Sequence, residues 1–357
     1  MNIILHTNAL TRRGDSITVG HYAKALQTFY YFNCIIAYDL KSANNDDAVI
    51  SLMNNEFKLF GYQNFSELEK FALENNTNIV YWVKSGQFDN KIIKTCKNVI
   101  HVVFNVISPH GDVYAYVSKW LAKEASSNYT KRFKSSKTLI KKFFLAPNFE
   151  NTNLIIKHFT KKINPDDYVP HIVELPEPNE GNFRKKYGFD SNSFIIGRIG
   201  GYDQFNIDFV KKWIEKIIEL YKDTHFVLIN TERFIDHSRV VFINEYISEQ
   251  EKSNFIKDCD MMLHAREMGE SFGLAIAESL FNNTPIASYY YGKDGNHREM
   301  LRNTGLLFKN EKELTQIFEQ AREGKFNEYD FTQIVQEFSP KEVVKKFVNI
   351  FVTNGEK

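Results

Sequence analysis

Short runs of apolar residues alternate along the chain with longer segments in which apolar residues recur every three or four positions. The short runs predict strands and the periodic segments predict helices. In the first half we expect strands at Asn2–Leu5, Cys34–Tyr38, Ile79–Val83 and Val99–Phe104, helices at Val19–Phe29 and Ser66–Glu74, and a strand-to-helix segment at Val113–Lys123. This alternation is typical of a parallel sheet that is covered by helices on both faces.

The alternation stops at a proline-rich segment and then begins again. Pro170, Pro176, Pro178 and Gly181 fall close together there, and proline fixes φ and lacks an N–H donor, which favours a linker. The second half predicts strands at Phe194–Arg198, Phe226–Asn230, Val240–Ile243, Met261–His264 and Pro285–Ser288, and helices at Phe209–Tyr221, Glu249–Lys257 and Leu274–Asn282.

We therefore predict an α/β protein with two doubly wound, Rossmann-like domains. The first spans residues 1–173, a linker spans 174–190, and the second domain spans 191–339. Doubly wound domains bind ligands at the C-terminal ends of their strands. Two such domains in tandem predict a ligand cleft between them.

Composition narrows the possible functions. The chain has 357 residues, 43% hydrophobic and 25% charged, as expected for a globular protein with a sizeable core. Its 45 basic and 44 acidic residues nearly cancel, so the net charge gives no indication of nucleic-acid binding. Cys34, Cys96 and Cys259 are widely separated, which suits a reducing compartment. The sequence has neither a signal-peptide pattern nor an apolar run of spanning length, so we expect a cytoplasmic protein.

The segment from Asp260 to Ser279 carries the clearest chemistry. An apolar strand leads into a polar, glycine-containing turn and then into a helix rich in Ala, Leu and Ile. Backbone N–H groups of Ser271, Phe272 and Gly273 would lie at the N-terminus of that helix, which is a natural site for an anion. Glu278, Ser279 and Asn282 form one narrow polar stripe on the helix. Its place beside the turn favours a stripe that faces a ligand cleft over one that faces solvent.

Glu270 and Glu278, with Phe-Gly-Leu after the first, resemble the E-x7-E motif of glycosyltransferase family 4. The resemblance implies a GT-B fold, with the two domains facing each other across the cleft and a C-terminal helix, about 340–357, packing back on the first domain. It implies that Glu270 contacts the donor sugar as the catalytic residue and that Glu278 binds the nucleotide ribose. The amides of Ser271, Phe272 and Gly273 would hold the diphosphate.

A second match is the segment that begins at Phe194. Arg198 resembles the arginine with which the family grips the diphosphate, and Gly200 and Gly201 follow it. The family's downstream lysine is missing here. Amides of the two glycines, Arg266 or Lys293 are the candidates to replace its charge.

The remaining donor-side candidates follow two further strands. Asn230, at the end of the strand Phe226–Asn230, is a candidate to face the diphosphate. Asn244 and Tyr246 match the segment that recognises the nucleotide base in the family.

The first domain resembles the family only in pattern. His110, next to Asp112, is the candidate catalytic histidine on the acceptor side, with a merely solvated loop histidine as the alternative. The basic segment Lys131–Lys142 favours a solvated helix face over peripheral contact with a membrane or an acidic acceptor. Asp258 and Asp260 form a D-x-D pattern, but no surrounding pattern supports a metal site, and we expect neither a metal nor another cofactor.

The resemblance implies retaining transfer of a sugar from a nucleotide-diphosphate donor to a hydroxyl of a glycan, a lipid or another acceptor. Other enzymes on the same fold remain open, namely a nucleotide-sugar epimerase and a phosphorylase. A non-catalytic module that binds nucleotide sugars is a further alternative, because the diphosphate lysine is missing.

Overall fold

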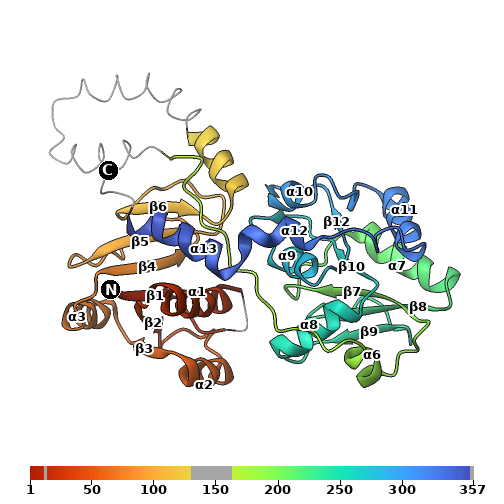
Figure 1. The fold of residues 1–357 in the computed structure, drawn as a ribbon, viewed down its shortest axis with the longest axis horizontal. Coiled ribbons are helices and arrows are strands. Elements are labelled where there is room, and N and C mark those ends of the chain that lie inside the picture. The colour runs from red at the N-terminus through yellow and green to blue at the C-terminus, as the bar shows by residue number, and fades with distance from the viewer. Residues whose placement is uncertain (12–13, 130–162, 354–357) are drawn as a thin grey trace. The chain divides into compact units, whose positions relative to one another are not determined.

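The computed structural model describes residues 1–11, 14–129 and 163–353. The predicted basic segment Lys131–Lys142 lies outside the described residues. The chain divides into two compact units, one made of residues 1–172 and 340–357 and the other of Val173–Ser339. We describe each unit by itself (Figure 1).

Unit 1 is a parallel sheet with helices on its faces. Its strands follow the order β3-β2-β1-β4-β5-β6, and every pair is parallel. The elements are β1 (Asn2–Thr7), α1 (Gly14–Tyr30), β2 (Asn33–Asp39), α2 (Asp47–Glu56), β3 (Lys58–Tyr62), α3 (Phe65–Glu74), β4 (Ile79–Lys84), β5 (Lys97–Val102), β6 (Val113–Tyr116), a helix described over 119–129, α13 (Pro340–Phe347) and the π-helix η2 (Val348–Val352).

The C-terminal helix completes the core of unit 1. Figure 1 shows α13, drawn in blue, beside α1, drawn in red. The Phe347 ring lies 5.3 Å from the ring of Tyr22, and the Phe351 ring lies 5.6 Å from that of His101. All four side chains are buried, so the end of the chain contributes apolar surface to a core that the first 172 residues begin.

Unit 2 repeats the same topology. Its six strands follow the order β14-β12-β10-β7-β8-β9, and a separate two-stranded sheet pairs β11 with β13. The elements are α6 (Asn182–Tyr187), β7 (Phe194–Ile199), α7 (Asp208–Leu220), β8 (Thr224–Ile229), β9 (Val240–Ile243), α8 (Glu249–Asp258), β10 (Met261–His264), β11 (Gly269–Glu270), α9 (Leu274–Phe281), β12 (Ile286–Tyr289), β13 (Asp294–Gly295), α10 (Asn296–Met300), β14 (Leu307–Phe308), α11 (Glu311–Arg322), α12 (Thr332–Val335) and the 3₁₀ helix η1 (Gln336–Phe338).

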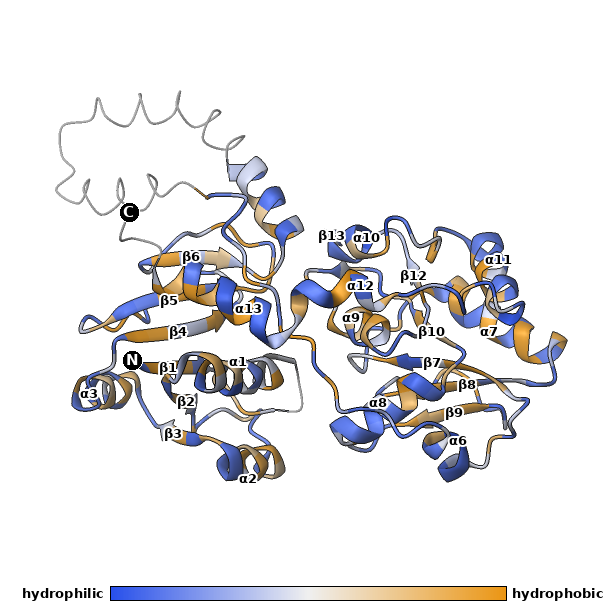
Figure 2. Ribbon diagram, in the orientation of Figure 1, coloured by the Kyte–Doolittle hydropathy of each residue, from blue (hydrophilic) through white to orange (hydrophobic). Residues whose placement is uncertain are grey.

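Amphipathic helices attach to these sheets by one face. The sequence of α7 places Val210, Trp213, Ile214, Ile217 and Ile218 inside, three or four positions apart as one helix face requires. The mixed orange and blue colouring of α7 in Figure 2 reflects this pattern. Trp213 packs edge-on against Phe226 of β8, with 6.0 Å between ring centroids.

The predicted linker differs in part from the structure. Residues 174–190 include α6, whose Phe183 packs on Phe255 of α8 with 5.0 Å between rings. Asp258 accepts hydrogen bonds from the backbone N–H groups of Gly181, Phe183 and Arg184 at the start of α6. The prolines therefore precede a helix that belongs to unit 2.

Candidate active site

In unit 2 the strand order reverses between β7 and β10. Strands on either side of such a point connect in opposite directions, which leaves a crevice at their carboxyl ends where ligands bind. Arg198 lies next to the end of β7, and His264 is the last residue of β10. Glu270 follows six residues after His264, just before α9.

Glu270 is held by two side chains from its own loop. His264 Nε2 lies 3.0 Å from Glu270 Oε1, and Arg266 Nη1 lies 3.0 Å from Oε2. Burial disfavours the charged carboxylate, but the hydrogen bond from His264 and the charge of Arg266 outweigh it, so the pKa of Glu270 is below its usual value. Glu270 is therefore an ionised, oriented carboxylate at neutral pH.

His264 extends this arrangement to the neighbouring strand. Its Nδ1 lies 2.9 Å from the hydroxyl of Ser288, near the end of β12. Because the Glu270 carboxylate only accepts hydrogen bonds, Nε2 of His264 must carry a proton. In the neutral ring, Nδ1 then accepts the Ser288 hydroxyl proton.

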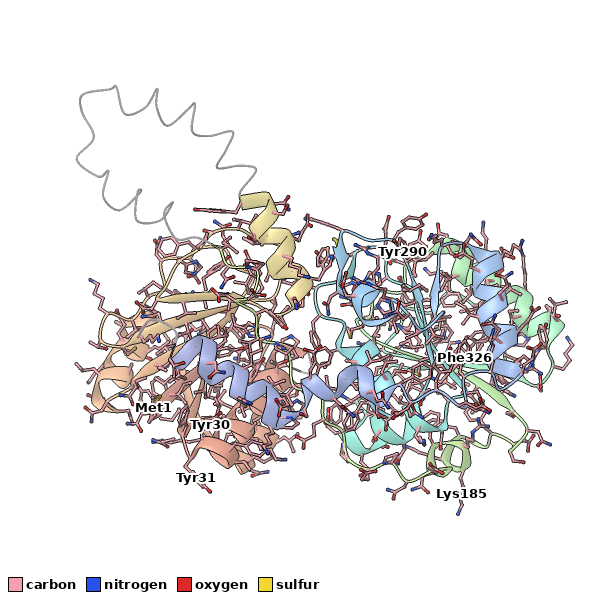
Figure 3. The ribbon with its side chains drawn as sticks, turned by 45° about the horizontal axis from the view of Figure 1, so that its top comes forward. Met1, Tyr30, Tyr31, Lys185, Tyr290 and Phe326 are labelled. Atoms are coloured by element: carbon pink, nitrogen blue, oxygen red, sulfur yellow. The ribbon has the colours of Figure 1, made fainter. Side chains whose placement is uncertain are left out.

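The backbone of Glu270 is fixed by a second histidine. The Glu270 N–H donates to Nδ1 of His297 at 3.3 Å, and Nε2 of His297 lies 3.3 Å from the carbonyl oxygen of Tyr290. Burial lowers the pKa of His297 to about 4, and the charge of Arg298 acts in the same direction. The ring is therefore neutral, with its proton on Nε2 donated to Tyr290, which is labelled in Figure 3.

Two glycines allow the chain to make this turn. Gly269 has a φ of 72° and Gly273 a φ of 92°, values that residues with a side chain rarely adopt. A Cβ on Gly269 would overlap the carbonyl oxygen of Asp294, its partner in the β11–β13 pair. Gly273 begins α9 and accepts hydrogen bonds from the N–H groups of Ile276 and Ala277.

The amides before α9 lie where the sequence predicted them. Ser271, Phe272 and Gly273 connect Glu270 to the helix, and the N-terminus of a helix favours negative charge. The Phe272 side chain is buried, and its carbonyl oxygen accepts a hydrogen bond from Asn296 at 2.7 Å.

Arg198 holds together the loops that follow β7 and β8. Its guanidinium donates to the carbonyl oxygens of Gly201 and Asn230, each at 2.7 Å, and to the Thr231 hydroxyl at 2.7 Å. Burial lowers the pKa of Arg198 to about 10, against the opposing charge of Glu270. Arg198 stays charged at neutral pH, and its N–H groups stabilise the turn rather than extending into solvent.

The other predicted donor-side residues lie along the same edge of the sheet. Asn230 donates to the carbonyl oxygen of Gly200 at 2.8 Å, and Asn244 accepts the N–H of Thr231 at 2.9 Å. Tyr246, after β9, is 51% exposed. The structure thus places Arg198, Asn230, Asn244 and Tyr246 at or just beyond the carboxyl ends of β7, β8 and β9.

The polar stripe on α9 faces α8. Glu278 Oε1 accepts a hydrogen bond from Lys252 at 2.7 Å, and Asn282 Oδ1 accepts one from Ser253 at 3.2 Å. Ser279 donates to the carbonyl oxygen of Thr284. A neighbouring helix with complementary polar groups therefore covers most of this stripe, so the stripe does not face bulk solvent.

His110 has a different environment in unit 1. It is 4% exposed, its Nδ1 donates to the carbonyl oxygen of Ser108 at 2.7 Å, and its ring lies edge-on to Phe88 and Tyr114. Asp112 accepts the backbone N–H of Asn98 at 2.6 Å. His110 is thus a buried side chain and not a solvated loop residue.

The two aspartates of the D-x-D pattern, Asp258 and Asp260, make structural contacts within unit 2. Asp258 caps α6, and Asp260 pairs with Arg184 at 2.7 Å and accepts the N–H of Ile195 at 2.6 Å. Within the described residues, no group of three or more His, Cys, Asp or Glu side chains is arranged to hold a metal ion. None of the described helices combines the length and the hydropathy needed to cross a bilayer.

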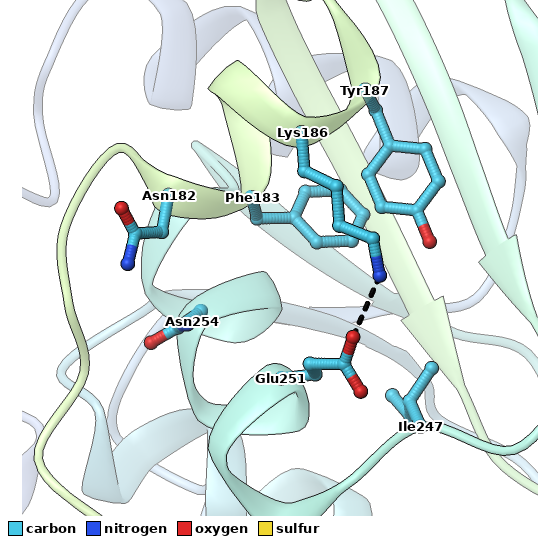
Figure 4. A pocket seen from close by; sticks show the side chains of 7 residues that line it. All are labelled: Asn182, Phe183, Lys186, Tyr187, Ile247, Glu251 and Asn254. Carbon is cyan, nitrogen blue, oxygen red and sulfur yellow. Dashed lines mark hydrogen bonds and ion pairs between the residues drawn. The ribbon is translucent and has the colours of Figure 1, made fainter.

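One small depression lies elsewhere on unit 2. Figure 4 shows it between α6 and α8, crossed by the Lys186–Glu251 ion pair at 2.6 Å, with Ile247 at its border. Its volume is about 260 Å³, below the range typical of small-molecule sites. We assign the candidate active site to Glu270 and its neighbours because charged groups converge there.

Sequence reasoning missed four of the side chains that build the site: His264, Ser288, His297 and Lys252. His264 had a detectable signal, since a polar residue at the end of a buried strand in a doubly wound domain lies at the ligand edge. The other three reach the site from segments whose positions depend on tertiary packing.

Comparison with solved structures identifies the fold. A glycosyltransferase from Rickettsia africae ESF-5 aligns over 98% of this chain and 97% of its own, with a TM-score of 0.63 and 13% identity. Anabaena Alr3699/HepE, solved with UDP and glucose, aligns over 98% of both chains with a TM-score of 0.62 and 12% identity. The UDP-GlcNAc 2-epimerase from Neisseria meningitidis, bound to UDP-GlcNAc, aligns over 99% of this chain and 100% of its own, with a TM-score of 0.58 and 10% identity.

No protein-family model matches the sequence, and no curated protein matches it. At these sequence identities the structural similarity supports an assignment of the fold alone. The α/β architecture with two six-stranded parallel sheets agrees with the glycosyltransferase neighbours and confirms the predicted GT-B fold, with two Rossmann-like domains.

Proposed function

We propose that the protein is a retaining glycosyltransferase that uses a nucleotide-diphosphate sugar. The observation that carries the proposal is the ionised carboxylate of Glu270, held by His264 and Arg266 immediately before the N-terminus of α9. A carboxylate there can select sugar hydroxyls, while helix amides and nearby arginines stabilise the charge that develops on a departing diphosphate.

In this proposal each predicted residue has a role. Glu270 orients the donor sugar and stabilises positive charge as the bond to the phosphate breaks. Ser271, Phe272 and Gly273 supply backbone amides that bind the diphosphate. The positive charge of Arg198 stabilises the diphosphate as well. Glu278 binds the ribose, while Asn244 and Tyr246 border the base. The chain supplies cations for the diphosphate itself, so the proposal requires no metal and no other cofactor.

Arg266 takes the place of the missing lysine in this scheme. Its guanidinium lies within the loop that carries Glu270, and its charge acts on both Glu270 and Arg198. Lys293 is the alternative, on the exposed loop before β13. His110 on the acceptor side stays a prediction, to be tested by its effect on transfer.

An epimerase is the second candidate, because UDP-GlcNAc 2-epimerases align over nearly the whole chain at TM-scores of 0.57 and 0.58. The deciding experiment first screens UDP- and GDP-sugars for thermal stabilisation, which rises with ligand concentration over Kd. The stabilising donor is then incubated alone. We expect slow hydrolysis that releases the nucleoside diphosphate; conversion of the intact donor into its 2-epimer would instead establish the epimerase.

Variants E270A and E278A complete the test. We expect E270A to abolish turnover while nucleotide binding persists, and E278A to weaken nucleotide binding. Unchanged turnover in both variants would refute the site assignment. Donor binding by the wild type without turnover, even with candidate acceptors, would leave a sugar-nucleotide-binding module.

A further inference from the structure

The carboxylate of Glu278 is buried between α8 and α9 in an ion pair with Lys252. Their side chains are 6% and 9% exposed, and the two charged atoms lie 2.7 Å apart. Lys252 also lies 3.0 Å from Glu249, one turn earlier on α8, whose side chain is 39% exposed. Lys252 is thus held from both sides and has little freedom to move.

The pair engages only one of the two carboxylate oxygens. Oε1 of Glu278 accepts the Lys252 hydrogen bond, whereas Oε2 accepts none from the described residues and keeps access to solvent. A carboxylate with one oxygen hydrogen-bonded and the other oxygen open can accept further hydrogen bonds from a ligand.

The surroundings fix the charges of the two groups. Burial raises the pKa of Glu278, and Lys252 opposes that effect. Burial also disfavours the Lys252 cation, but Glu278 and Glu249 outweigh it and raise the pKa of Lys252. Without Lys252, the only charged group beside the buried Glu278 carboxylate would be another acid, Glu249. The ionised form of Glu278 would then lose the ammonium group that stabilises it.

Lys252 lies close in sequence to the proposed base-binding residues Asn244 and Tyr246. Ser248, two residues after Tyr246, caps α8, and Lys252 falls in the first turns of that helix. Helices α8 and α9 both begin at the carboxyl edge of the sheet, where the nucleotide is proposed to bind. The ribose of a nucleoside offers two adjacent hydroxyl groups, from which a carboxylate can accept hydrogen bonds.

We propose that Lys252 is a positioning residue of the nucleotide site, which holds Glu278 so that Oε2 accepts hydrogen bonds from the vicinal hydroxyls of the nucleotide ribose. The inference rests on the proposed function and adds the group that makes Glu278 selective for ribonucleotides. Lys252 itself touches neither the sugar nor the diphosphate.

The test compares ribonucleotide with 2′-deoxyribonucleotide binding to the full-length protein. The dissociation constants of UDP and 2′-deoxy-UDP, and of GDP and 2′-deoxy-GDP, are measured by calorimetry for the wild type, K252M, K252R and E278Q. We expect the wild type to prefer the ribonucleotide about tenfold or more, since a hydrogen bond to a charged group contributes this much. K252M and E278Q should reduce the preference to about threefold or less, and K252R should retain most of it.

Lys257 provides the matched control. It lies on the same helix and pairs with Glu180 at 3.6 Å, with its side chain 32% exposed. K257M removes the same charge from α8, so we expect it to keep the wild-type ribose preference. If K252M does not fold, K252Q replaces it: its polar amide is tolerated better in this buried site, but it removes the charge that keeps Glu278 ionised, so the ribose preference should also be lost.

The outcomes separate the two proposals. Failure of the wild type to bind any of the nucleotides would overturn the proposed function. Binding without a ribose preference, or a preference that survives in K252M, K252Q or E278Q, would overturn the role of Lys252 and leave the proposed function standing.

Discussion

His264 connects two segments of the site through a single ring. It accepts from Ser288 and donates to Glu270, so removing it frees the carboxylate to rotate. We expect H264A to lower donor turnover by about a hundredfold, the size of effect that misplacement of a catalytic group produces. Turnover is measured as release of nucleoside diphosphate from the donor.

Glutamine is the informative replacement at this position. Its amide can still donate to Glu270, so H264Q should retain more turnover than H264A. The Kd for the nucleotide should stay within about twofold in both variants, because His264 acts on the sugar end of the site. An H264A variant with wild-type turnover would show that Arg266 and the backbone position Glu270 without His264.

Arg198 is expected to stabilise unit 2. In R198K an ammonium replaces a planar group whose N–H atoms reach two loops at once, and lysine cannot reproduce that geometry. Buried carbonyl oxygens would lose their donors, so we expect a loss of about 3 kcal/mol of unfolding free energy. Urea denaturation followed by the fluorescence of Trp213, buried in unit 2, measures it.

Arg233 is the control for Arg198. Its side chain is 59% exposed and pairs with Asp236, which is 97% exposed, at 3.2 Å. R233K should change the unfolding free energy by less than about 0.5 kcal/mol, as is usual for surface pairs. Equal losses in R198K and R233K would contradict a specific role for the buried guanidinium.

The β11–β13 pair tests how far the site depends on one backbone turn. G269A should be much more damaging than G305A, although their φ values are similar, 72° and 75°. A Cβ at Gly305 meets nothing within 4 Å, whereas one at Gly269 would overlap Asp294. We expect G305A to cost about 1–2 kcal/mol of unfolding free energy from backbone strain alone.

In G269A the same strain would be joined by separation of β11 from β13, which would displace Glu270. Unfolding by urea and donor turnover should therefore both suffer in G269A, with turnover unchanged in G305A. Equal effects of the two substitutions would mean that the β11–β13 contact does not hold Glu270.

The strands and helices illustrate which parts of the fold local sequence determines. Val240–Ile243 and Met261–His264 were predicted with the bounds that the structure has, because buried parallel strands form compact apolar runs. The edge strand β3 and helix α2 were not predicted. Only Tyr62 of β3 and Met53 of α2 are buried, so neither segment has a strong periodic pattern.

The candidate site divides in the same way. Glu270 and the turn at Gly269–Gly273 follow from a strand, a glycine turn and a helix that are contiguous in sequence. The partners Ser288 and His297 lie 24 and 27 residues from the groups they contact, and Lys252 lies 26 residues from Glu278. Lys252 in a charged helix resembles a solvated residue, and only the packing of α8 on α9 shows that it is buried.

The two units share one topology but differ in their buried histidines. His6, His101 and His171 are buried in unit 1 and His297 in unit 2. Burial lowers the pKa of His6 to about 3 and that of His101 to about 4, and it lowers the pKa of His171. In unit 2 burial lowers the pKa of His297 to about 4, and it lowers the pKa of the partly exposed His225.

Acid should therefore weaken unit 1 before unit 2. Below a pH of about 6.5 the unfolded chain binds protons on these histidines and the folded chain does not, so folding stability falls as the pH falls toward each folded pKa. At pH 5 His6 and His101 should together remove about 4 kcal/mol from unit 1 relative to pH 7, His171 should add to that loss, and His297 should remove about 2 kcal/mol from unit 2. Urea-dependent hydrogen exchange at the two pH values, corrected for intrinsic rates and read in peptides from β4 and β8, distinguishes the units.

H101Q removes one titrating group from unit 1 and should reduce the acid sensitivity of the β4 peptide by about a third. Loss of protection in β8 before β4 on acidification would contradict the assignment, because it would require the neutral histidines of unit 1 to be protonated in the folded state.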